Sequence, residues 1–117
     1  MDPRDLVDAV LAGNALRARQ WVADAVRANF DWHGVARPTG LDHVREALLA
    51  SLVELLAERS GQVAPEWTRE VPPLSEATFL VRSAERMKNT RRDCEENGPE
   101  ALRRRRFLAP PDFLKVA

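Results

Sequence analysis

Four consecutive arginines at residues 103–106 are the side chains of this sequence with the clearest capacity for chemistry. Guanidinium groups form paired hydrogen bonds with phosphate or carboxylate, so the run could bind nucleic acid or an acidic protein surface. Successive helical residues are rotated by about 100°, however, which would point the four side chains in nearly all directions. Glu100 also precedes Arg103 and Arg104 in the favourable order for pairing. The run therefore predicts a partly neutralised charged rim rather than a uniform phosphate-binding face.

A second basic cluster precedes this run and is followed closely by acidic residues. Its members are Arg82, Arg86, Lys88, Arg91 and Arg92. We expect Arg91 and Arg92 to pair with the glutamates four residues later, at positions 95 and 96. Exposed pairs of this kind contribute little to stability, so the cluster is interpreted first as a solvated surface.

Large apolar side chains follow the arginines, although chain ends are usually polar. The last eleven residues include Phe107, Leu108, Phe113, Leu114 and Val116. Burial of each would contribute roughly 1.5 to 3 kcal/mol, so we expect them to be covered. Either this tail folds back onto its own domain, or it occupies a groove on a partner.

Candidate catalytic groups are few. His33 and His43 each follow an aspartate closely, which would suit an oriented imidazole or a pair of metal ligands in an enzyme. Their spacing fits no zinc or catalytic pattern, and the chain has no cysteine pair to complete a zinc site. Cys94 has an acidic residue on each side, which would raise the pKa of its thiol and oppose a nucleophilic role. We therefore expect a non-enzymatic protein with no catalytic, cofactor or metal site, and loop hydrogen bonds for the histidines.

Composition limits the kind of protein that positions these groups. The 117 residues suit a single domain (1–117) with one modest core. Basic and acidic residues number 18 each, so no global field would attract nucleic acid or a membrane. Cys94 is the only cysteine, and the sequence shows neither a signal-peptide pattern nor an apolar run that could span a membrane. These features predict a cytoplasmic protein.

Three helices are predicted within residues 1–62. The first begins with Asp2 as its cap and Pro3 in its first turn, and the second begins after Asn14. The third, within residues 41–61, has an apolar stripe so wide that it must contact more than one neighbour. Its carboxylates, including Glu54, are expected on the exposed face. The pattern predicts a helical core with the third helix at its centre.

Residues 63–117 follow a different pattern. Prolines interrupt the first part, which suits an extended segment packed on a surface. A helix is predicted from about Ser75 to Gly98, either continuous or broken near Ser83, and a short turn after Pro99 carries the arginine run. Strand signals are poor throughout. The expected fold class is all-α: a small helical bundle of three N-terminal helices, with a proline-interrupted, partly helical C-terminal half packed on it or on a partner.

The first two helices also fit a helix-turn-helix hypothesis. Their short connection would place Arg17, Arg19 and Gln20 near the start of a recognition helix, where base contacts are made. A plain helical hairpin has the same pattern, and the excess of acidic residues in this half disfavours DNA. A small nucleic-acid-binding regulator, using this hairpin or the C-terminal arginine clusters, is the alternative function.

The C-terminal half resembles a pattern in small bacterial proteins from GC-rich genomes. Their shared features are, in order, Pro-x-Trp, Pro-Leu, Phe-Leu, Arg-Met and a basic run before phenylalanine. They occur here in PEWTREVPPLSEATFLVRSAERM and GPEALRRRRFLAPPDFLKVA. Some of these proteins look like companions of toxin-type enzymes in paired genes. The resemblance covers about half of the chain, contains no active-site motif, and implies docking rather than catalysis.

Together these features predict an antitoxin-like interaction protein that binds and occludes a cognate bacterial enzyme through its C-terminal half. Apolar side chains would anchor the partner, and arginines would contact acidic groups on it. The predicted partner-binding residues are Trp67, Leu74, Phe79, Leu80, Arg86, Met87, Arg103, Arg104, Arg105, Arg106, Phe107, Phe113 and Leu114.

Overall fold

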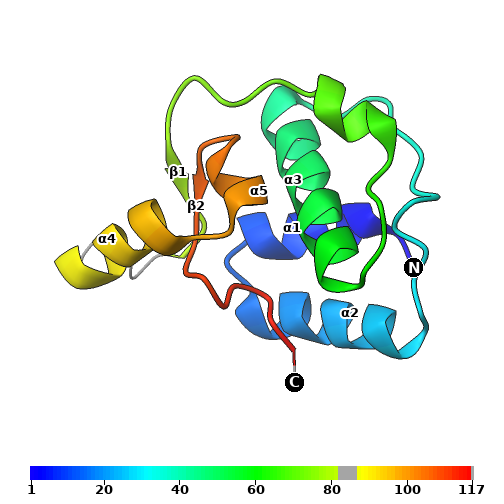
Figure 1. Cartoon of the computed structure of the whole chain (residues 1–117), viewed down its shortest axis with the longest axis horizontal. Coiled ribbons are helices and arrows are strands. Elements are labelled where there is room, and N and C mark those ends of the chain that lie inside the picture. Colours follow the sequence, from blue (N-terminus) through cyan, green and yellow to red (C-terminus); the bar gives the residue numbers. More distant parts are fainter. Residues whose placement is uncertain (82–86, 117) are drawn as a thin grey trace.

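The computed structural model describes residues 1–81 and 87–116, and this part of the chain is mostly helical (Figure 1). Three helices come first: α1 (Pro3–Leu11), α2 (Ala15–Arg27) and α3 (His43–Arg59). They are followed by the 3-10 helix η1 (Glu66–Glu70), the strand β1 (Thr78–Phe79), α4 (Lys88–Asn97), α5 (Glu100–Arg103) and the strand β2 (Phe107–Leu108). The three N-terminal helices lie where the sequence predicts them, and the small helical fold is confirmed.

Local capping determines where α1 and α2 begin and end. The carboxylate of Asp2 accepts a hydrogen bond from the backbone N–H two residues later, and Pro3 occupies the first turn of α1. Gly13 follows α1 with a φ of 72°, a left-handed conformation that favours glycine. Asn14 then caps α2 by accepting from the backbone N–H three residues later. The two helices therefore form a tight hairpin.

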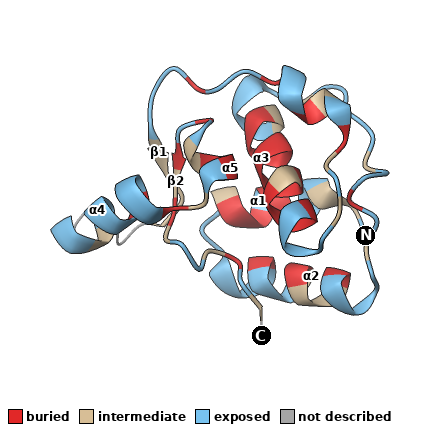
Figure 2. Ribbon diagram, in the orientation of Figure 1, coloured by how far each residue is buried: buried red, intermediate tan, exposed pale blue. Residues whose placement is uncertain are grey.

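The central helix α3 is covered on most of its faces (Figure 2). Three elements pack against it: α1, which precedes it in the chain, and η1 and α5, which follow it. The side chains of Leu48, Leu52 and Val53 are at most 1% exposed. The prediction that this helix contacts more than one neighbour is confirmed.

An aromatic cluster joins α2 to the segment that follows it. The ring centroids of Trp21, Phe30 and Trp32 lie 4.6 to 5.8 Å apart. Gln62, just after α3, binds this segment with both the oxygen and the nitrogen of its side-chain amide. It accepts from the backbone N–H of Trp32 at 2.8 Å and donates to the carbonyl of Phe30 at 2.9 Å. The cluster thereby closes one end of the helical core.

The C-terminal half packs on the helices of its own chain. α5 lies against α3 (Figure 1) and buries Leu102 there. Phe107 in β2 is fully buried, and Leu114 is 5% exposed. Residues 109–116, called the C-terminal strap below, return toward α2 (Figure 1). Of the two arrangements that the sequence allows, the structure contains the tail that folds onto its own domain.

The expected all-α fold needs one correction in this half. Thr78 and Phe79 do not belong to a helix, because they form a strand that pairs in parallel with Phe107 and Leu108. The backbone N–H of Leu80 continues the pairing by donating to the carbonyl of Leu108 at 2.9 Å. Long-range pairing supplies these hydrogen bonds, so local propensity does not reveal the strand. Of the predicted helix, the described residues after this strand form a helix from Lys88 to Asn97, as α4, and residues 82–86, where a break was predicted, lie outside the described part.

Gly98 allows α4, α5 and the strap to approach one another closely. A Cβ atom on Gly98 would lie 2.5 Å from the carbonyl oxygen of Ala109 and 2.6 Å from that of Cys94. Both neighbours are backbone atoms, so a side chain at this position would force the junction apart. Beyond the junction α4 projects from the body, and Cys94 is its one buried side chain (Figure 2).

Candidate partner-binding surface

The arginines of the run reach different parts of their own chain. Arg103 donates from Nε to the carbonyl of Gly98 at 2.7 Å, at the junction of α4 and α5. Arg106 donates from Nη1 to the carbonyl of Ser75 at 2.6 Å, just before β1. The two arginines between them turn toward α3. The four side chains thus do not form one basic face, as predicted, although α5 ends at Arg103 and the two central arginines both turn toward α3.

Glu54 on α3 receives the two central arginines. Arg104 Nη2 and Arg105 Nη2 each lie 2.5 Å from a different oxygen of this carboxylate. The side chains of Glu54 and Arg105 are 10% and 7% exposed, whereas that of Arg104 is 58% exposed. Arg105 also donates to two backbone carbonyls around η1. Two expectations are corrected: Glu54 is not on an exposed face, and it takes the neutralising role expected of Glu100.

The ion pairs predicted on α4 are present. Arg91 and Arg92 lie 3.2 and 3.7 Å from the carboxylates of the glutamates four residues later. The guanidinium of Arg91 also lies over the ring of Phe79, 5.4 Å from its centroid, which is within reach of a cation–π interaction. Arg82 and Arg86 lie outside the described residues, so the role predicted for Arg86 stays a prediction.

Several of the residues predicted to bind a partner are buried inside this chain. Leu74, Phe107 and Leu114 are 7%, 0% and 5% exposed. Trp67 is half-buried, and its indole N–H donates to a backbone carbonyl of the segment before α3 at 2.7 Å. Met87 stands apart from them and is 58% exposed. In this conformation the buried residues support the surface rather than form it.

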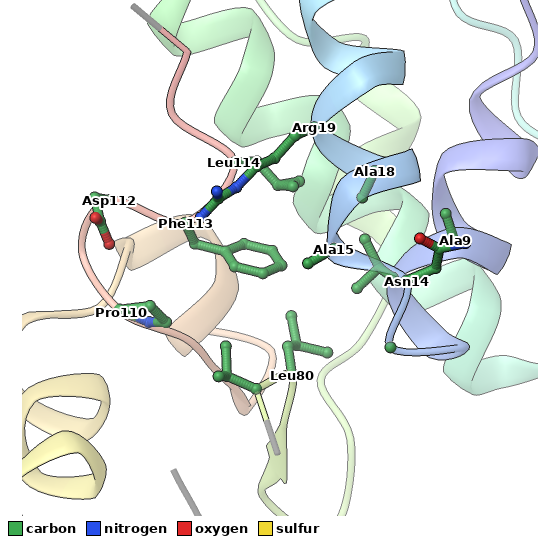
Figure 3. A pocket seen from close by; sticks show the side chains of 13 residues that line it. Ala9, Asn14, Ala15, Ala18, Arg19, Leu80, Pro110, Asp112, Phe113 and Leu114 are labelled. Carbon is green, nitrogen blue, oxygen red and sulfur yellow. The ribbon is translucent and has the colours of Figure 1, made fainter. Parts of the chain in front are cut away.

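Leu80, Phe113 and Leu114 meet around one pocket (Figure 3). Leu80 follows β1, whereas the other two residues belong to the strap. The opposite wall comes from the α1–α2 hairpin and includes Ala15 and Ala18. The pocket has a volume of about 350 Å³, which is in the range of sites that bind small ligands. Three of the residues singled out for docking are thus brought together from two segments.

The hairpin wall of this pocket was missed by sequence reasoning. Three of its residues, Ala9, Val10 and Ala18, belong to the apolar stripes of α1 and α2, so the pattern assigns them to core packing. The available signal was the turn at Gly13 and Asn14, which brings the end of one helix close to the start of the next. That turn indicates a hairpin, but it does not indicate what packs against it.

Arg59 at the end of α3 holds the strap in place. Its guanidinium donates to the carbonyls of Phe113 at 2.5 Å and Pro111 at 3.3 Å. Burial lowers the pKa of Arg59, while the nearby carboxylate of Asp112 acts in the opposite direction and favours the charged form. The strap therefore carries its own counter-charge beside the side chain that binds it.

The histidines and the cysteine have structural surroundings. His33 Nδ1 lies 2.9 Å from the carbonyl oxygen of Val63, and His43 Nε2 lies 3.3 Å from that of Pro73. Cys94 is fully buried, and burial, followed by its acidic neighbours, raises the pKa of its thiol as the sequence predicts. Within residues 1–81 and 87–116, no group of three or more His, Cys, Asp or Glu residues could hold a metal ion.

The residues of the helix-turn-helix hypothesis lie on the surface. Arg17, Arg19 and Gln20 are exposed at the start of α2. Gln20 donates to the carboxylate of Asp24 on the same helix at 3.0 Å, and Arg19 borders the pocket. The four arginines at 103–106 contact their own chain, although Arg104 and Arg106 remain exposed, and Arg82 and Arg86 of the second basic cluster lie outside the described residues. The nucleic-acid hypothesis therefore stays a prediction.

Comparisons with protein-family models, curated proteins and solved structures find no match to this chain. No helix among the described residues is long and apolar enough to cross a membrane. A functional proposal must therefore rest on the pocket and on the contacts that shape it.

Proposed function

We propose that this chain is an antitoxin-like, non-enzymatic interaction protein of the bacterial cytoplasm. It would bind a cognate enzyme through its C-terminal half and occlude it. The observation that carries the proposal is the convergence of Leu80, Phe113 and Leu114 on one pocket of about 350 Å³. Leu80 and Phe113 are only half-buried, so they retain apolar surface that a partner could cover.

Binding at this pocket would depend on a few apolar side chains of the enzyme. An aromatic or aliphatic side chain that enters the pocket loses its hydration and gains contacts with the walls. Central, desolvated anchors of this kind supply most of the energy of many protein interfaces. The surface around the pocket, including the projecting helix α4, would then cover part of the enzyme.

The arginine run has two roles in this proposal. Arg103 and Arg105 hold α5 and the segments around η1 in the arrangement that positions β2 and the strap. Arg104 and Arg106 are exposed and keep part of their guanidinium surface toward solvent. Neither of them lines the pocket, so these two side chains would contact acidic groups of the enzyme outside the apolar anchors.

Filling the pocket tests this proposal. The substitution Ala15→Trp places an indole ring on the hairpin wall at an exposed position, so the core of the protein is left intact. The matched control is Ala28→Trp, which is also exposed and lies at the other end of α2, about 20 Å away along the helix axis. The candidate partner is the enzyme encoded beside this chain's gene, and both its binding and its activity are measured.

We expect Ala15→Trp to weaken binding by about tenfold or more and to restore the activity of the enzyme. Ala28→Trp should bind and inhibit like the wild-type protein. Circular dichroism and urea unfolding establish that both variants are folded. Equal inhibition by Ala15→Trp and the wild type would exclude the pocket as the docking site, and no binding by the wild type would exclude this partner.

A further inference from the structure

Arg19 is a charged side chain at the edge of the pocket whose role the proposed function leaves unassigned. It is exposed on α2, and its side chain extends toward the strap beside Phe113 and Leu114 (Figure 3). No hydrogen bond or ion pair joins its guanidinium to any residue of the described part. A positive charge thus lies beside an apolar pocket.

The other polar side chains that line the pocket are Asn14 and Asp112. The side chain of Asn14 caps α2 by accepting from the backbone N–H of Arg17 at 3.1 Å. Asp112 lies near Arg59, which binds the strap, and its charge favours the charged form of that guanidinium by opposing the fall of its pKa. Among the described residues that line the pocket, Arg19 is the one cationic side chain.

We propose that the pocket recognises a two-part feature of the partner: an apolar side chain that enters the pocket, and the side-chain carboxylate of a neighbouring acidic residue that pairs with Arg19. The inference rests on the proposed function, because it specifies the chemistry of the same docking site. The apolar walls select the first part, and charge complementarity at the edge selects the second.

The geometry explains why a neighbouring residue can supply the carboxylate. Arg19 lies one helical turn beyond Ala15 on α2, so the Cα atoms of these two pocket residues are about 6 Å apart along the helix. Adjacent residues of a bound segment place their Cα atoms about 3.8 Å apart, and their side chains extend the reach further. A short Asp-Leu segment can therefore span both parts of the site.

Two capped peptides that differ in one charge test this inference without the partner enzyme. Acetyl-Asp-Leu-amide and acetyl-Asn-Leu-amide have nearly the same shape, and their binding to the full chain is followed by NMR titration. The test variant is Arg19→Gln. The matched control is Arg17→Gln, since Arg17 is exposed on the same helix but does not line this pocket. Ala15→Trp reports whether the peptides occupy the pocket.

We expect the wild type to bind the Asp peptide about three- to fivefold more tightly than the Asn peptide. Arg19→Gln should remove this preference, Arg17→Gln should keep it, and Ala15→Trp should abolish binding of both peptides. Raising the salt concentration should reduce the preference because the Arg19 edge is exposed. The inference is overturned if the two peptides bind equally, if Arg19→Gln keeps the preference, or if neither peptide binds at millimolar concentration.

The two proposals fail in different ways. If the peptide preference is present but the adjacent-gene enzyme does not bind, the proposed function fails and the specificity of the pocket stands. The second case is that the enzyme binds the wild type and Arg19→Gln equally tightly, while Ala15→Trp prevents binding. The carboxylate recognition then fails and the docking site stands.

Discussion

The two halves of this protein are held in place by different kinds of contact. In residues 1–62 the core consists of aliphatic side chains from three helices, with Leu48, Leu52 and Val53 of α3 almost fully buried. Among the described residues of the second half, 63–81 and 87–116, fewer apolar side chains are buried, and arginine side chains bind backbone carbonyls at successive points. The first half is organised by packing, and the second is organised by directed hydrogen bonds.

This difference indicates what each half can tolerate. Apolar packing is non-directional, so a core can accept an altered side chain of similar volume. A charge-assisted hydrogen bond fixes one donor against one acceptor, and a buried charge that loses its partner is costly. Arg105 connects the two halves, because it contacts Glu54 on α3 and also the carbonyls around η1. The run therefore sets the shape of the C-terminal half.

The largest expected effect tests whether the two halves form one cooperative unit. Phe107→Ala removes a fully buried ring from the C-terminal half, and Leu52→Ala removes a buried side chain from α3. Loss of the phenylalanine ring lowers the free energy of unfolding by about 3 to 5 kcal/mol, and loss of the leucine side chain lowers it by about 2 to 5 kcal/mol. We expect both variants to lower the free energy of unfolding by comparable amounts in urea titrations, each with a single transition.

Two separate unfolding transitions in Phe107→Ala would contradict this expectation. If Phe107→Ala showed two transitions, with the helical signal of α1 to α3 lost only in the second, the C-terminal half would be an independent unit. The different contacts of the two halves would then also mean different stabilities.

The second prediction concerns the ion pairs that Glu54 forms with Arg104 and Arg105. Glu54→Gln keeps the shape of the side chain but leaves the buried guanidinium of Arg105 without a counter-charge, which should cost about 3 kcal/mol. The matched variant Arg104→Gln removes the other, mostly exposed, partner of Glu54 and should cost less than about 1 kcal/mol. Urea unfolding of both variants provides the measurement. Equal losses would show that burial of Arg105 does not distinguish the two ion pairs.

The N-terminal half could be predicted from sequence because its determinants are local. Asp2 and Asn14 cap helices within three residues of their own position, and the wide stripe of α3 is visible along a single segment. The pairs on α4 could also be predicted, since each joins residues four positions apart. Such patterns need no knowledge of the tertiary structure.

The ion pairs of Glu54 and the pairing of the two strands could not be predicted in the same way. Glu54 lies on a leucine-rich helix, and a carboxylate there indicates an exposed face unless its arginine partners, about fifty residues away, are known. Thr78 pairs with Phe107 through backbone atoms, which carry no sequence signal of their own. For the pocket, the strap side was predicted from its apolar residues, but the hairpin side was not.

The smallest expected effect also belongs to the C-terminal half and depends on pH. Burial raises the pKa of the Cys94 thiol above its ordinary value of 9.0, so the native chain holds this proton at pH values where the unfolded chain has lost it. The unfolded state then binds fewer protons, and the free energy of unfolding falls as pH rises. The stabilisation is complete below about pH 9 and is lost as pH rises through the native pKa.

The variant Cys94→Ala isolates this effect, since a chain without the thiol should lose less stability between about pH 8 and about pH 10. The chain has no tyrosine, whose phenol would titrate in the same pH range. If the halves unfold together, the pH effect appears in the whole urea transition, although Cys94 lies on the projecting helix α4. Equal pH slopes for the wild type and Cys94→Ala would mean that the thiol titrates alike in both states, contrary to its burial.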